Sequence, residues 1–377
     1  MGGAADESLT LEQAMLTEGR IAEQFELDGR VIQVRPYGRG IINDTFLVTT
    51  DRKGGERAVL QRINGRVFPE PALIMANLRT LLDHARWRQA DASGTLGHFR
   101  LPDILPARDG RDYVVDDEGG FWRLISFIEG SCSIEAITTL DQAAEIGVAL
   151  GCFHVLVSDL EADRLHDTLP GFHITPCYLE RFNTLIEQPW SAPDSPELRF
   201  GLDFINARQG QAGVLEAAKD QGVLRIRPVH GDPKLSNILF SERSGRAASI
   251  IDLDTVKPGL LHYDIGDCLR SCCNTASQGG IAARAVDFDL DIARAILGSY
   301  FQKTREFLSR DDFLCLYEAI WLIPFELGVR FLTDYLEGNV YFRFIEPEEN
   351  LRRAMVQFRL VESIERQEGP IRALLCR

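Results

Sequence analysis

The pattern of hydrophobic and polar residues changes character near residue 130. Before that point, short runs rich in β-branched and aromatic residues alternate with turns such as Lys53-Gly54-Gly55, a pattern typical of strands. The predicted strands are Val31–Tyr37, Thr45–Thr50, Arg57–Ile63, Tyr113–Val115 and Trp122–Ile128. Helical spacing of apolar residues predicts one principal helix at Pro71–Gln89 and a short helix at residues 11–28. The first 130 residues are therefore expected to form a small antiparallel sheet with one main helix.

Helical spacing dominates the rest of the chain. Helices are predicted at Ile134–Val157, Tyr178–Ile186, Leu202–Lys219 and from Ile265 to the end. Three short strands interrupt them, at Arg227–Val229, Ile238–Phe240 and Ala248–Leu253. This division predicts an α+β chain of two lobes, an N-lobe at residues 1–127 and a mainly helical C-lobe at residues 128–377. A hinge is expected at Phe127–Ser131, with a cleft between the lobes.

The strongest chemical signal is the stretch His230-Gly231-Asp232-Pro233-Lys234-Leu235-Ser236-Asn237. Its spacing, H-x-D-x-x-x-x-N, matches the catalytic loop of kinases. Asp232 is predicted to orient the attacking hydroxyl and accept its proton. Lys234 is placed to neutralise charge on the transferring phosphoryl group, and Asn237 to supply an oxygen ligand to Mg²⁺. Taken alone, Asp232 and Asn237 could equally be turn residues.

The residues that follow strengthen the kinase interpretation. A predicted hairpin runs from Ile238 through a polar turn and returns at Asp252-Leu253-Asp254. Alternation along a strand would place the carboxylates of Asp252 and Asp254 on one face. Together with the amide oxygen of Asn237 they would form a hard oxygen site, which Mg²⁺ prefers in combination with phosphate oxygens. The sequence therefore predicts ATP and Mg²⁺ as cofactors, with Asn237, Asp252 and Asp254 as metal ligands.

The N-lobe carries a weaker signal for nucleotide binding. The backbone amides of Gly38-Arg39-Gly40 could approach the phosphates of ATP, although a plain hairpin turn explains the glycines equally well. The strand Arg57–Ile63 lacks the lysine that protein kinases carry there, so Arg62 is the nearest candidate for a phosphate-binding cation. With the catalytic loop, these features predict a protein-kinase-like fold.

These motifs resemble those of the aminoglycoside phosphotransferase and choline kinase superfamily. Within it, the chain looks most like the N-acetylhexosamine 1-kinase branch, which phosphorylates the anomeric hydroxyl of N-acetylated sugars. The stretches that carry this second resemblance are residues 40–45, 59–64, 169–173 and 328–336. The resemblance implies the same catalytic base and metal ligands. It also suggests that Asp44 and Arg330 contact a sugar acceptor.

Several other polar residues have structural interpretations. His154 is expected to make a structural hydrogen bond on a helix, whereas Asp264 and Asp267 are expected to begin a helix and brace the catalytic loop. His173 either anchors its loop or lines the acceptor site. Arg330 lies in an apolar helix and needs a partner, for which Asp334 is the structural alternative to an acceptor.

Composition limits the partners and the compartment. The chain of 377 residues has a formal net charge of −15, which argues against nucleic acid as a partner. It has no long uncharged apolar stretch, so no membrane span is expected, and its first ten residues lack the features of a signal peptide. None of the eight cysteines forms a C-x-x-C pair, which favours buried reduced thiols over a metal site. A cytoplasmic location is therefore expected.

The identity of the acceptor stays open at this point. The leading interpretation is transfer of a phosphoryl group from ATP to a sugar hydroxyl. An amino alcohol or aminoglycoside is the alternative, because a cationic acceptor would suit acidic or aromatic residues in the C-lobe. Absence of the peptide-docking segment of protein kinases favours a small molecule in either case. A catalytically inactive nucleotide-binding module is a third possibility, and the intact catalytic residues argue against it.

Overall fold

The structure is a computed structural model that describes residues 17–38, 42–91, 98–190, 192–278 and 286–376. The chain divides into two compact units. The first comprises Met1–Leu82 with Leu101–Gly130, and the second comprises Asp83–Arg100 with Ser131–Arg377. The long helix α2 (Pro71–Asp91) contributes residues to both units.

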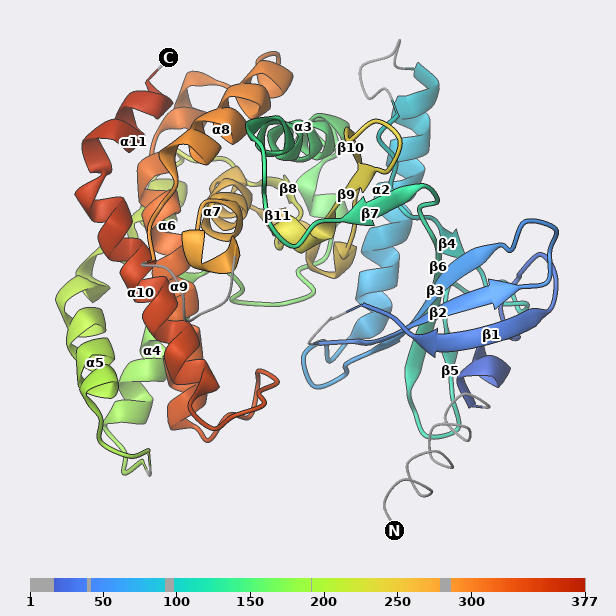
Figure 1. Ribbon diagram of the computed structural model, residues 1–377, viewed down its shortest axis with the longest axis horizontal. Coiled ribbons are helices and arrows are strands. Elements are labelled where there is room, and N and C mark those ends of the chain that lie inside the picture. The colour runs from blue at the N-terminus through green and yellow to red at the C-terminus, as the bar shows by residue number, and fades with distance from the viewer. Residues whose placement is uncertain (1–16, 39–41, 92–97, 191, 279–285, 377) are drawn as a thin grey trace. The chain divides into compact units, whose positions relative to one another are not determined.

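The first unit is built on an antiparallel sheet of six strands (Figure 1). The strand order is β1-β2-β3-β6-β4, and β5 also pairs with β6. The strands are β1 Val31–Pro36, β2 Asp44–Thr50, β3 Arg57–Ile63, β4 Ile104–Leu105, β5 Val114–Val115 and β6 Phe121–Ser126. The five predicted strands are all present, with ends shifted by at most two residues. Strand β4 was not predicted, because two residues are too few to show an alternating pattern.

One face of this sheet packs on a hydrophobic core. Alternate residues of β3, Ala58 and Leu60, are fully buried in it, as the period of two requires. Phe25 completes the core from the segment before β1. The helix predicted at residues 11–28 is shorter than expected. Among its described residues only 17–22 are helical, because Phe25 forms a β-bridge with Ala107 instead.

The second unit is mainly helical. Its helices are α3 Leu140–Leu156, α4 Thr175–Ile186, α5 Pro196–Arg208, α6 Val214–Asp220, α7 Leu261–Cys272, α8 Leu290–Thr304, α9 Leu316–Leu336, α10 Glu349–Arg366 and α11 Glu368–Leu375. Almost every residue of α9 is buried, and α9 packs against α4, α7 and α10. Helices α3 and α8 approach closely at Gly147, where a Cβ atom would lie 2.1 Å from the carbonyl oxygen of Ile296. The α+β prediction of a strand-rich first part and a helical remainder is confirmed.

Two predicted helices have different bounds. The helix expected from Ile134 begins at Leu140, because the Thr139 side chain accepts a hydrogen bond from the Gln142 N–H (3.2 Å) and so caps the helix there. The short strand β7 (Ser131–Ser133) precedes it.

The helix predicted at Leu202–Lys219 is in fact two helices, α5 and α6. The 3₁₀ turn η2 (Gln209–Gln211) and Gly213 separate them. Helix α5 also begins earlier than predicted, since Ser195 caps it from just before Pro196.

Two small antiparallel sheets hold the central loops of the second unit. In the first sheet, strand β8 (Arg227–Val229) pairs with β11 (Lys257–Gly259). Strand β9 (Ile238–Ser241) pairs with β10 (Ala247–Ile250) on one side and with β7 on the other. The predicted hairpin is therefore present. These sheets fix the ends of two loops, residues 230–237 and 251–256.

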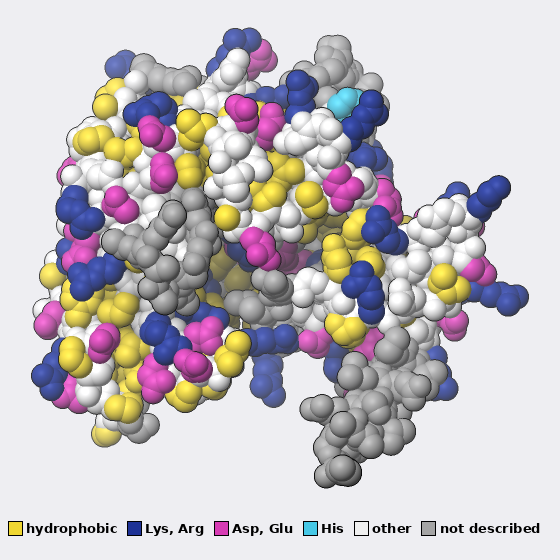
Figure 2. Space-filling model, in the orientation of Figure 1, with side chains coloured by type: hydrophobic (Ala, Val, Ile, Leu, Met, Phe, Trp, Pro, Cys, Tyr) yellow, Lys and Arg dark blue, Asp and Glu magenta, His cyan; other side chains and the backbone are white. Residues whose placement is uncertain are grey.

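Charged side chains of both signs are interspersed over the face of the molecule shown in Figure 2. Within the described residues, no helix is both long and apolar enough to span a membrane. The eight cysteines are free thiols, and four of them are buried, namely Cys152, Cys268, Cys272 and Cys273. The prediction of buried thiols is wrong for Cys132, Cys177 and Cys376, which are exposed.

Candidate active site

The loop between β8 and β9 carries the H-x-D-x-x-x-x-N motif. Gly231 has a φ angle of +85°, a conformation that glycine adopts without steric cost. A Cβ atom at this position would lie 2.7 Å from the carbonyl oxygen of Thr255, in the 3₁₀ turn η4 (Leu253–Thr255). Thr255 Oγ1 in turn donates a hydrogen bond to the carbonyl oxygen of His230 (2.8 Å). Only glycine therefore fits here, and the contact holds the loop against η4.

His230 has a structural role in this loop. Its ring is buried, and the Asp232 N–H donates to Nδ1 (3.2 Å), so this nitrogen carries no proton. Nε2 therefore carries the proton and donates to the carbonyl oxygen of Ile251 (3.0 Å). Burial lowers the pKa of His230, in agreement with a neutral ring. The ring joins the catalytic loop to the segment after β10.

Asp264, in the first turn of α7, braces the loop as predicted. Its fully buried carboxylate accepts hydrogen bonds from the N–H groups of His230 (2.7 Å) and Gly231 (2.8 Å). His154 Nε2 lies 2.9 Å from the same carboxylate, and His154 Nδ1 lies 2.8 Å from the Tyr300 hydroxyl. Burial alone would raise the pKa of Asp264, but the hydrogen bonds and charges of His154 and His230 together outweigh it and lower the pKa. His154 thus makes the structural hydrogen bond expected of it.

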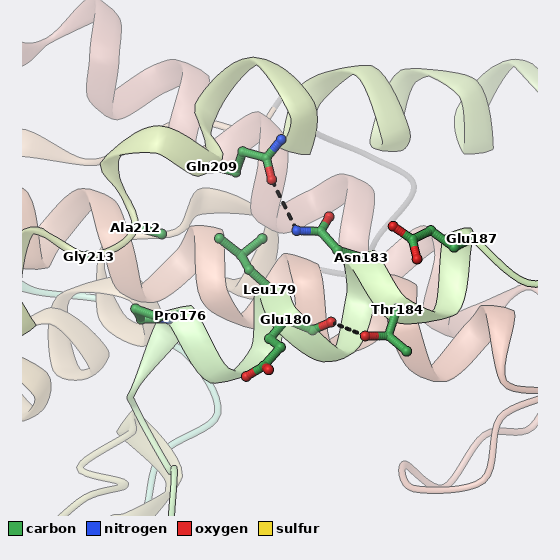
Figure 3. A pocket seen from close by; sticks show the side chains of 9 residues that line it. All are labelled: Pro176, Leu179, Glu180, Asn183, Thr184, Glu187, Gln209, Ala212 and Gly213. Atoms are coloured by element: carbon green, nitrogen blue, oxygen red, sulfur yellow. Dashed lines mark hydrogen bonds between the residues drawn. The ribbon is translucent and has the colours of Figure 1, made fainter.

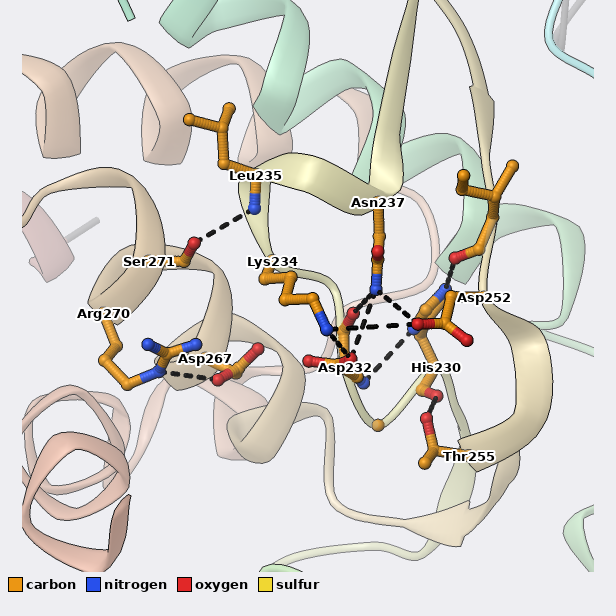
Figure 4. A network of polar contacts seen from close by, with 12 residues as sticks. His230, Asp232, Lys234, Leu235, Asn237, Asp252, Thr255, Asp267, Arg270 and Ser271 are labelled. Atoms are coloured by element: carbon orange, nitrogen blue, oxygen red, sulfur yellow. Dashed lines mark hydrogen bonds and ion pairs between the residues drawn. The ribbon is translucent and has the colours of Figure 1, made fainter. Parts of the chain in front are cut away.

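Four predicted side chains meet at the end of the loop (Figure 4). Lys234 Nζ lies 2.5 Å from Asp232 Oδ2 and 3.9 Å from Asp252 Oδ2. Asn237 Nδ2 lies 3.2 Å from Asp232 Oδ2 and 3.4 Å from Asp252 Oδ2. Burial would lower the pKa of Lys234, but the charges of Asp232 and Asp252 raise it, so the side chain is an ammonium. The cluster places two carboxylates, a cation and an amide within one small volume.

The donor set of this cluster fits a divalent cation. Asn237 Nδ2 also donates to the backbone carbonyl of Asp232 (2.8 Å), which leaves Oδ1 of the amide for another partner. The described residues contain no group of three or more His, Cys, Asp or Glu side chains arranged to hold a metal. Asn237 and Asp252 are the residues that would hold such an ion, together with oxygen ligands from a bound nucleotide. Mg²⁺ is commonly bound in this way, by one or two protein ligands and phosphate oxygens.

The argument that grouped Asp254 with Asp252 was wrong. Strand β10 ends at Ile250, and Asp252 adopts a left-handed conformation with φ at +65°. The chain then enters η4, so strand alternation does not continue to Asp254. The Asp252 side chain is 39% exposed, whereas Asp254 is buried and its carbonyl oxygen accepts a hydrogen bond from Thr168 Oγ1 (3.1 Å). A metal-binding role for Asp254 stays a prediction without that support.

The nucleotide-binding residues predicted in the first unit are only partly described. Gly38 has a φ angle of +78°, which suits a glycine turn, and Gly40 lies outside the described residues. Arg62 pairs with Trp122 across β3 and β6, and its guanidinium carbon lies 5.8 Å from the centre of the Trp122 ring. Asp44 begins β2, opposite Arg62. The functional roles of these residues stay predictions.

Arg330 lies near the cluster, in the same unit. Its guanidinium carbon lies 5.0–5.6 Å from the centres of three aromatic rings, those of Phe172, Tyr178 and Phe342. Its Nη1 is 3.9 Å from Glu326 Oε1, one turn earlier on α9. The charge of Asp232 is one of the influences that raise the Arg330 pKa, although burial opposes them, so the two groups are within electrostatic range.

The alternative partner proposed for Arg330 was wrong. Asp334 accepts hydrogen bonds from three backbone N–H groups and from Asn350 Nδ2 (2.9 Å). The three N–H groups belong to Val340, Tyr341 and Phe342. Asp334 therefore fixes the turn after α9 and does not neutralise Arg330.

Asp267 was expected to begin the helix and brace the catalytic loop, but it lies beyond the first turn of α7 and pairs with Arg270 on the same helix. Its Oδ1 accepts a hydrogen bond from Arg270 Nε (2.8 Å), but its buried Oδ2 has no hydrogen-bond partner. Its charge is among those that raise the pKa of Lys234, against the effect of burial, so Asp267 lies on the cluster side of α7 (Figure 4). A buried carboxylate oxygen without a partner is costly, and a bound ligand that donates a hydrogen bond would satisfy it.

A pocket of about 500 Å³ lies elsewhere in the second unit, between α4 and the segment around η2 (Figure 3). Its lining includes Leu179, Asn183 and Gln209, and the Asn183 amide donates to Gln209 Oε1 (3.3 Å) across it. None of the predicted catalytic or metal-binding residues lines this pocket. The clustering of the motif residues, and not the size of a pocket, therefore identifies the candidate active site.

Comparison with known proteins agrees with this site. The model of the phosphotransferase enzyme family (APH) matches residues 33–297, which include the whole catalytic loop and the segment to Asp264. The chain belongs to this family. Its members transfer phosphoryl groups to hydroxyl groups of small molecules, so the chain is a phosphotransferase.

Solved structures support the same fold. An aminoglycoside phosphotransferase from Alicyclobacillus acidocaldarius matches with a TM-score of 0.63 and 14% identity, over 94% of this chain and 95% of that one. A microcompartment-associated aminopropanol kinase matches with a TM-score of 0.58 and 16% identity, over 94% and 98%. The amicoumacin kinase hAmiN, solved with AMP-PNP, Ca²⁺ and Ami, matches with a TM-score of 0.57 and 14% identity, over 97% and 96%. The predicted protein-kinase-like fold is thereby confirmed.

Proposed function

We propose that this phosphotransferase moves the γ-phosphoryl group of ATP to a hydroxyl group of a sugar, with an N-acetylhexosamine and its anomeric hydroxyl as the leading acceptor. The acceptor oxygen forms the new bond to phosphorus while the bond from the γ-phosphorus to the bridging oxygen breaks, and ADP leaves with that electron pair. The proton of the hydroxyl passes to the Asp232 carboxylate. A bound Mg²⁺ would neutralise charge on the phosphate oxygens.

The arrangement around Asp232 supports this chemistry. The hydrogen bonds from Lys234 and Asn237 both reach Oδ2 of the carboxylate, so Oδ1 is left to face a substrate hydroxyl. Lys234 is held within the same cluster, where its ammonium group can stabilise the negative charge that develops on the phosphoryl oxygens. Asn237 and Asp252 would hold the metal ion. Since Asp264 fixes the backbone before Asp232, the base is positioned before substrate binds.

The observation that favours a sugar is the environment of Arg330. The Arg330 guanidinium makes no hydrogen bond to any other described residue, and three aromatic rings surround it. A polyhydroxyl acceptor offers lone pairs to a guanidinium and flat apolar faces to aromatic rings. Asp267 Oδ2 would accept a hydrogen bond from another hydroxyl. The role of Asp44 in sugar binding stays a prediction from the sequence.

An amino alcohol or aminoglycoside is the second candidate. Two of the matched structures are those of an aminopropanol kinase and an aminoglycoside phosphotransferase. The unpartnered Asp267 oxygen would also suit an ammonium group of such an acceptor. Against it, a cationic acceptor would have to approach both Arg330 and Lys234. Like charges at short range in a buried site are unfavourable.

An acceptor screen tests the proposal. The purified enzyme is given ATP and Mg²⁺ with N-acetylhexosamines, unsubstituted hexoses, aminopropanol, choline, homoserine or an aminoglycoside. Release of ADP gives the rate, and phosphorus NMR identifies the phosphorylated atom. We expect turnover of a hexosamine or hexose to exceed that of every amino alcohol. Phosphorylation of an amino alcohol without sugar turnover would exclude the sugar and leave the phosphotransferase activity intact.

Two arginine variants separate acceptor binding from stability. Arg330→Gln should raise the KM for the acceptor and leave the KM for ATP near its wild-type value, because the proposal places the acceptor, and not ATP, against this side chain. The matched control is Arg359→Gln, since Arg359 also stacks on a phenylalanine, Phe200 at 4.2 Å, but is half-exposed on α10. Equal effects of both substitutions on the acceptor KM would contradict a role for Arg330 in the acceptor site.

A further inference from the structure

His173 occupies an unusual position just before α4. It has a φ angle of +65°, which is rare for a residue with a side chain, and it is 4% exposed. Nε2 lies 2.7 Å from the carbonyl oxygen of Gly231, the residue before the predicted base. Nδ1 lies 3.1 Å from Glu326 Oε1, one turn before Arg330 on α9. The ring therefore connects the catalytic loop to the helix that carries Arg330.

The two partners of His173 determine its protonation. A carbonyl oxygen can only accept a hydrogen bond, and an ionised carboxylate is likewise only an acceptor. The other oxygen of Glu326 accepts a hydrogen bond from Thr175 Oγ1 (2.9 Å), and Arg330 Nη1 lies 3.9 Å from Oε1, so both carboxylate oxygens face donor groups. A neutral imidazole has one N–H and could satisfy only one of its two contacts. Both are satisfied when both ring nitrogens carry a proton.

The charges around the ring agree with this form. Burial lowers the pKa of His173, but the charge and hydrogen bond of Glu326 outweigh it, and the pKa is raised. Tyr263 stacks on the ring from α7, with centroids 5.5 Å apart, and Asp267 on the same helix adds negative charge. The charged and titratable groups that face the site from α4, α7, α9 and the catalytic loop are Tyr178, Tyr263, Asp267, Glu326, Arg330 and Asp232.

We propose that His173 is an imidazolium that positions the catalytic loop through the Gly231 carbonyl and takes up the charge of Glu326, which leaves the Arg330 guanidinium to the acceptor. The last part rests on the proposed function, whereas the charge of His173 does not. Glu326 lies 3.1 Å from the His173 ring but 3.9 Å from the guanidinium, so its hydrogen bond goes to the histidine. The site then keeps the positive charge of Arg330, which favours a neutral or anionic acceptor over a cationic one.

The neighbouring backbone shows that His173 anchors its loop. Lys257 Nζ donates to the carbonyl oxygen of Leu169 (3.1 Å), and Thr168 Oγ1 donates to the carbonyl oxygen of Asp254 (3.1 Å). The segment before α4 is thus attached to β11, to η4 and, through His173, to the catalytic loop. Of the two roles predicted for His173, the contacts support the anchor. A residue is held in a left-handed conformation when surrounding contacts determine it in this way.

NMR of the full-length enzyme with ¹⁵N-labelled histidine rings tests the charge directly. The chain has seven histidines, and the signals of His173 are identified as those missing from the spectrum of His173→Asn. Asparagine is chosen because it tolerates a left-handed backbone. We expect both ring nitrogens of His173 to stay protonated above pH 6.5, the ordinary pKa of histidine. A signal from one bare nitrogen at pH 7 in the folded wild-type enzyme would overturn the proposal.

A glutamate variant tests the cause of that charge. In Glu326→Gln the amide can donate or accept, so we expect His173 to become neutral near pH 7. The matched control is Glu337→Gln, at the end of the same helix, where Glu337 pairs with Arg181 (2.5 Å) and does not contact His173. If His173 stays doubly protonated in Glu326→Gln, Glu326 is not the group that holds the charge. This measurement needs no substrate, so its result does not depend on whether the acceptor is a sugar.

Kinetics test the positioning role. Loss of a charge-assisted hydrogen bond to the loop should lower kcat in His173→Asn by about tenfold or more, with the KM for ATP unchanged. In the wild-type enzyme kcat should fall as pH rises through the pKa measured by NMR, and this alkaline limb should be absent from His173→Asn. An unchanged kcat, or the same alkaline limb in the variant, would refute positioning by His173.

Discussion

Asp264→Asn is the substitution that most directly tests how the catalytic loop is held. In the wild-type protein Oδ2 accepts hydrogen bonds from the His230 N–H and from His154, and Oδ1 accepts one from the Gly231 N–H. An asparagine has only one acceptor oxygen. If that oxygen keeps the two contacts of Oδ2, the amide N–H₂ faces the Gly231 N–H, and two donors oppose each other in a buried site.

The expected cost follows from these contacts. A hydrogen bond to a charged group contributes about 1.5–3 kcal/mol, and a buried donor left without a partner costs about 1–3 kcal/mol. Together they predict a loss of about 3–5 kcal/mol in the free energy of unfolding. Displacement of the loop at Gly231 should also lower kcat, by about 100-fold for a shift near 1 Å at Asp232.

Urea unfolding followed by circular dichroism measures the first effect, and steady-state kinetics measures the second. With a slope of about 3 kcal/mol per molar urea, the midpoint should fall by about 1–1.7 M. The control is Asp291→Asn in the first turn of α8, whose side chain is 70% exposed. It should leave the midpoint and kcat close to the wild type. A midpoint for Asp264→Asn equal to that of the control, with kcat unchanged, would refute the bracing role.

The pH dependence of stability adds an internal check on the same residue. The pKa of Asp264 is lowered in the folded protein, because the hydrogen bonds and charges of His154 and His230 together outweigh burial. Its contribution is therefore fully present above the unfolded carboxylate pKa of about 3.9 and is lost as pH falls through the folded value. Asp264→Asn should lack this part of the acid destabilisation. Identical acid profiles for the variant and the wild type would place the acid-sensitive group elsewhere.

Further substitutions test the base and the metal ligands. Asp232→Asn should lower kcat by several orders of magnitude while ATP affinity, measured by calorimetry, is retained, because the carboxylate acts on the acceptor hydroxyl and not on the nucleotide. Near-normal turnover in that folded variant would exclude Asp232 as the base. Asn237→Ala and Asp252→Ala should each raise the Mg²⁺ concentration needed for half-maximal rate, since each removes a hard oxygen ligand. A magnesium titration that is the same in both variants as in the wild type would contradict the metal assignment.

The parts of the fold that the sequence predicted are those determined by local patterns. Strand β3 shows an alternation of period two and is bounded by turn residues, and its predicted bounds are those observed. The catalytic loop was identifiable because Asp232, Lys234 and Asn237 lie within six residues and their spacing alone brings them together. The helix bounds were less accurate. A side-chain cap such as Thr139 decides where a helix begins, and a periodic pattern does not reveal it.

Features that depend on distant contacts or on unusual backbone angles were not predictable. The left-handed turn at Asp252 ended the strand on which the grouping with Asp254 depended, and no preceding residue signals such a turn. Glu326 escaped notice because its partner His173 is 153 residues away in the sequence. Pairing of Arg330 with Asp334 was plausible at a spacing of four residues. It fails because backbone N–H groups after α9 already occupy that carboxylate.

The residues proposed for phosphoryl transfer and those proposed for acceptor recognition lie in different parts of the chain. The residues proposed for the reaction lie in the loop between β8 and β9, close together in sequence and within the range 33–297 that the family model matches. The proposed acceptor environment combines His173 with Glu326 and Arg330 from α9, and residues 326 and 330 lie beyond that range. Changes in α9 and in the segment before α4 should therefore alter which hydroxyl is phosphorylated, while changes in the catalytic loop should alter only how fast. The charge of His173 links the two, because one ring contacts both the loop and the helix.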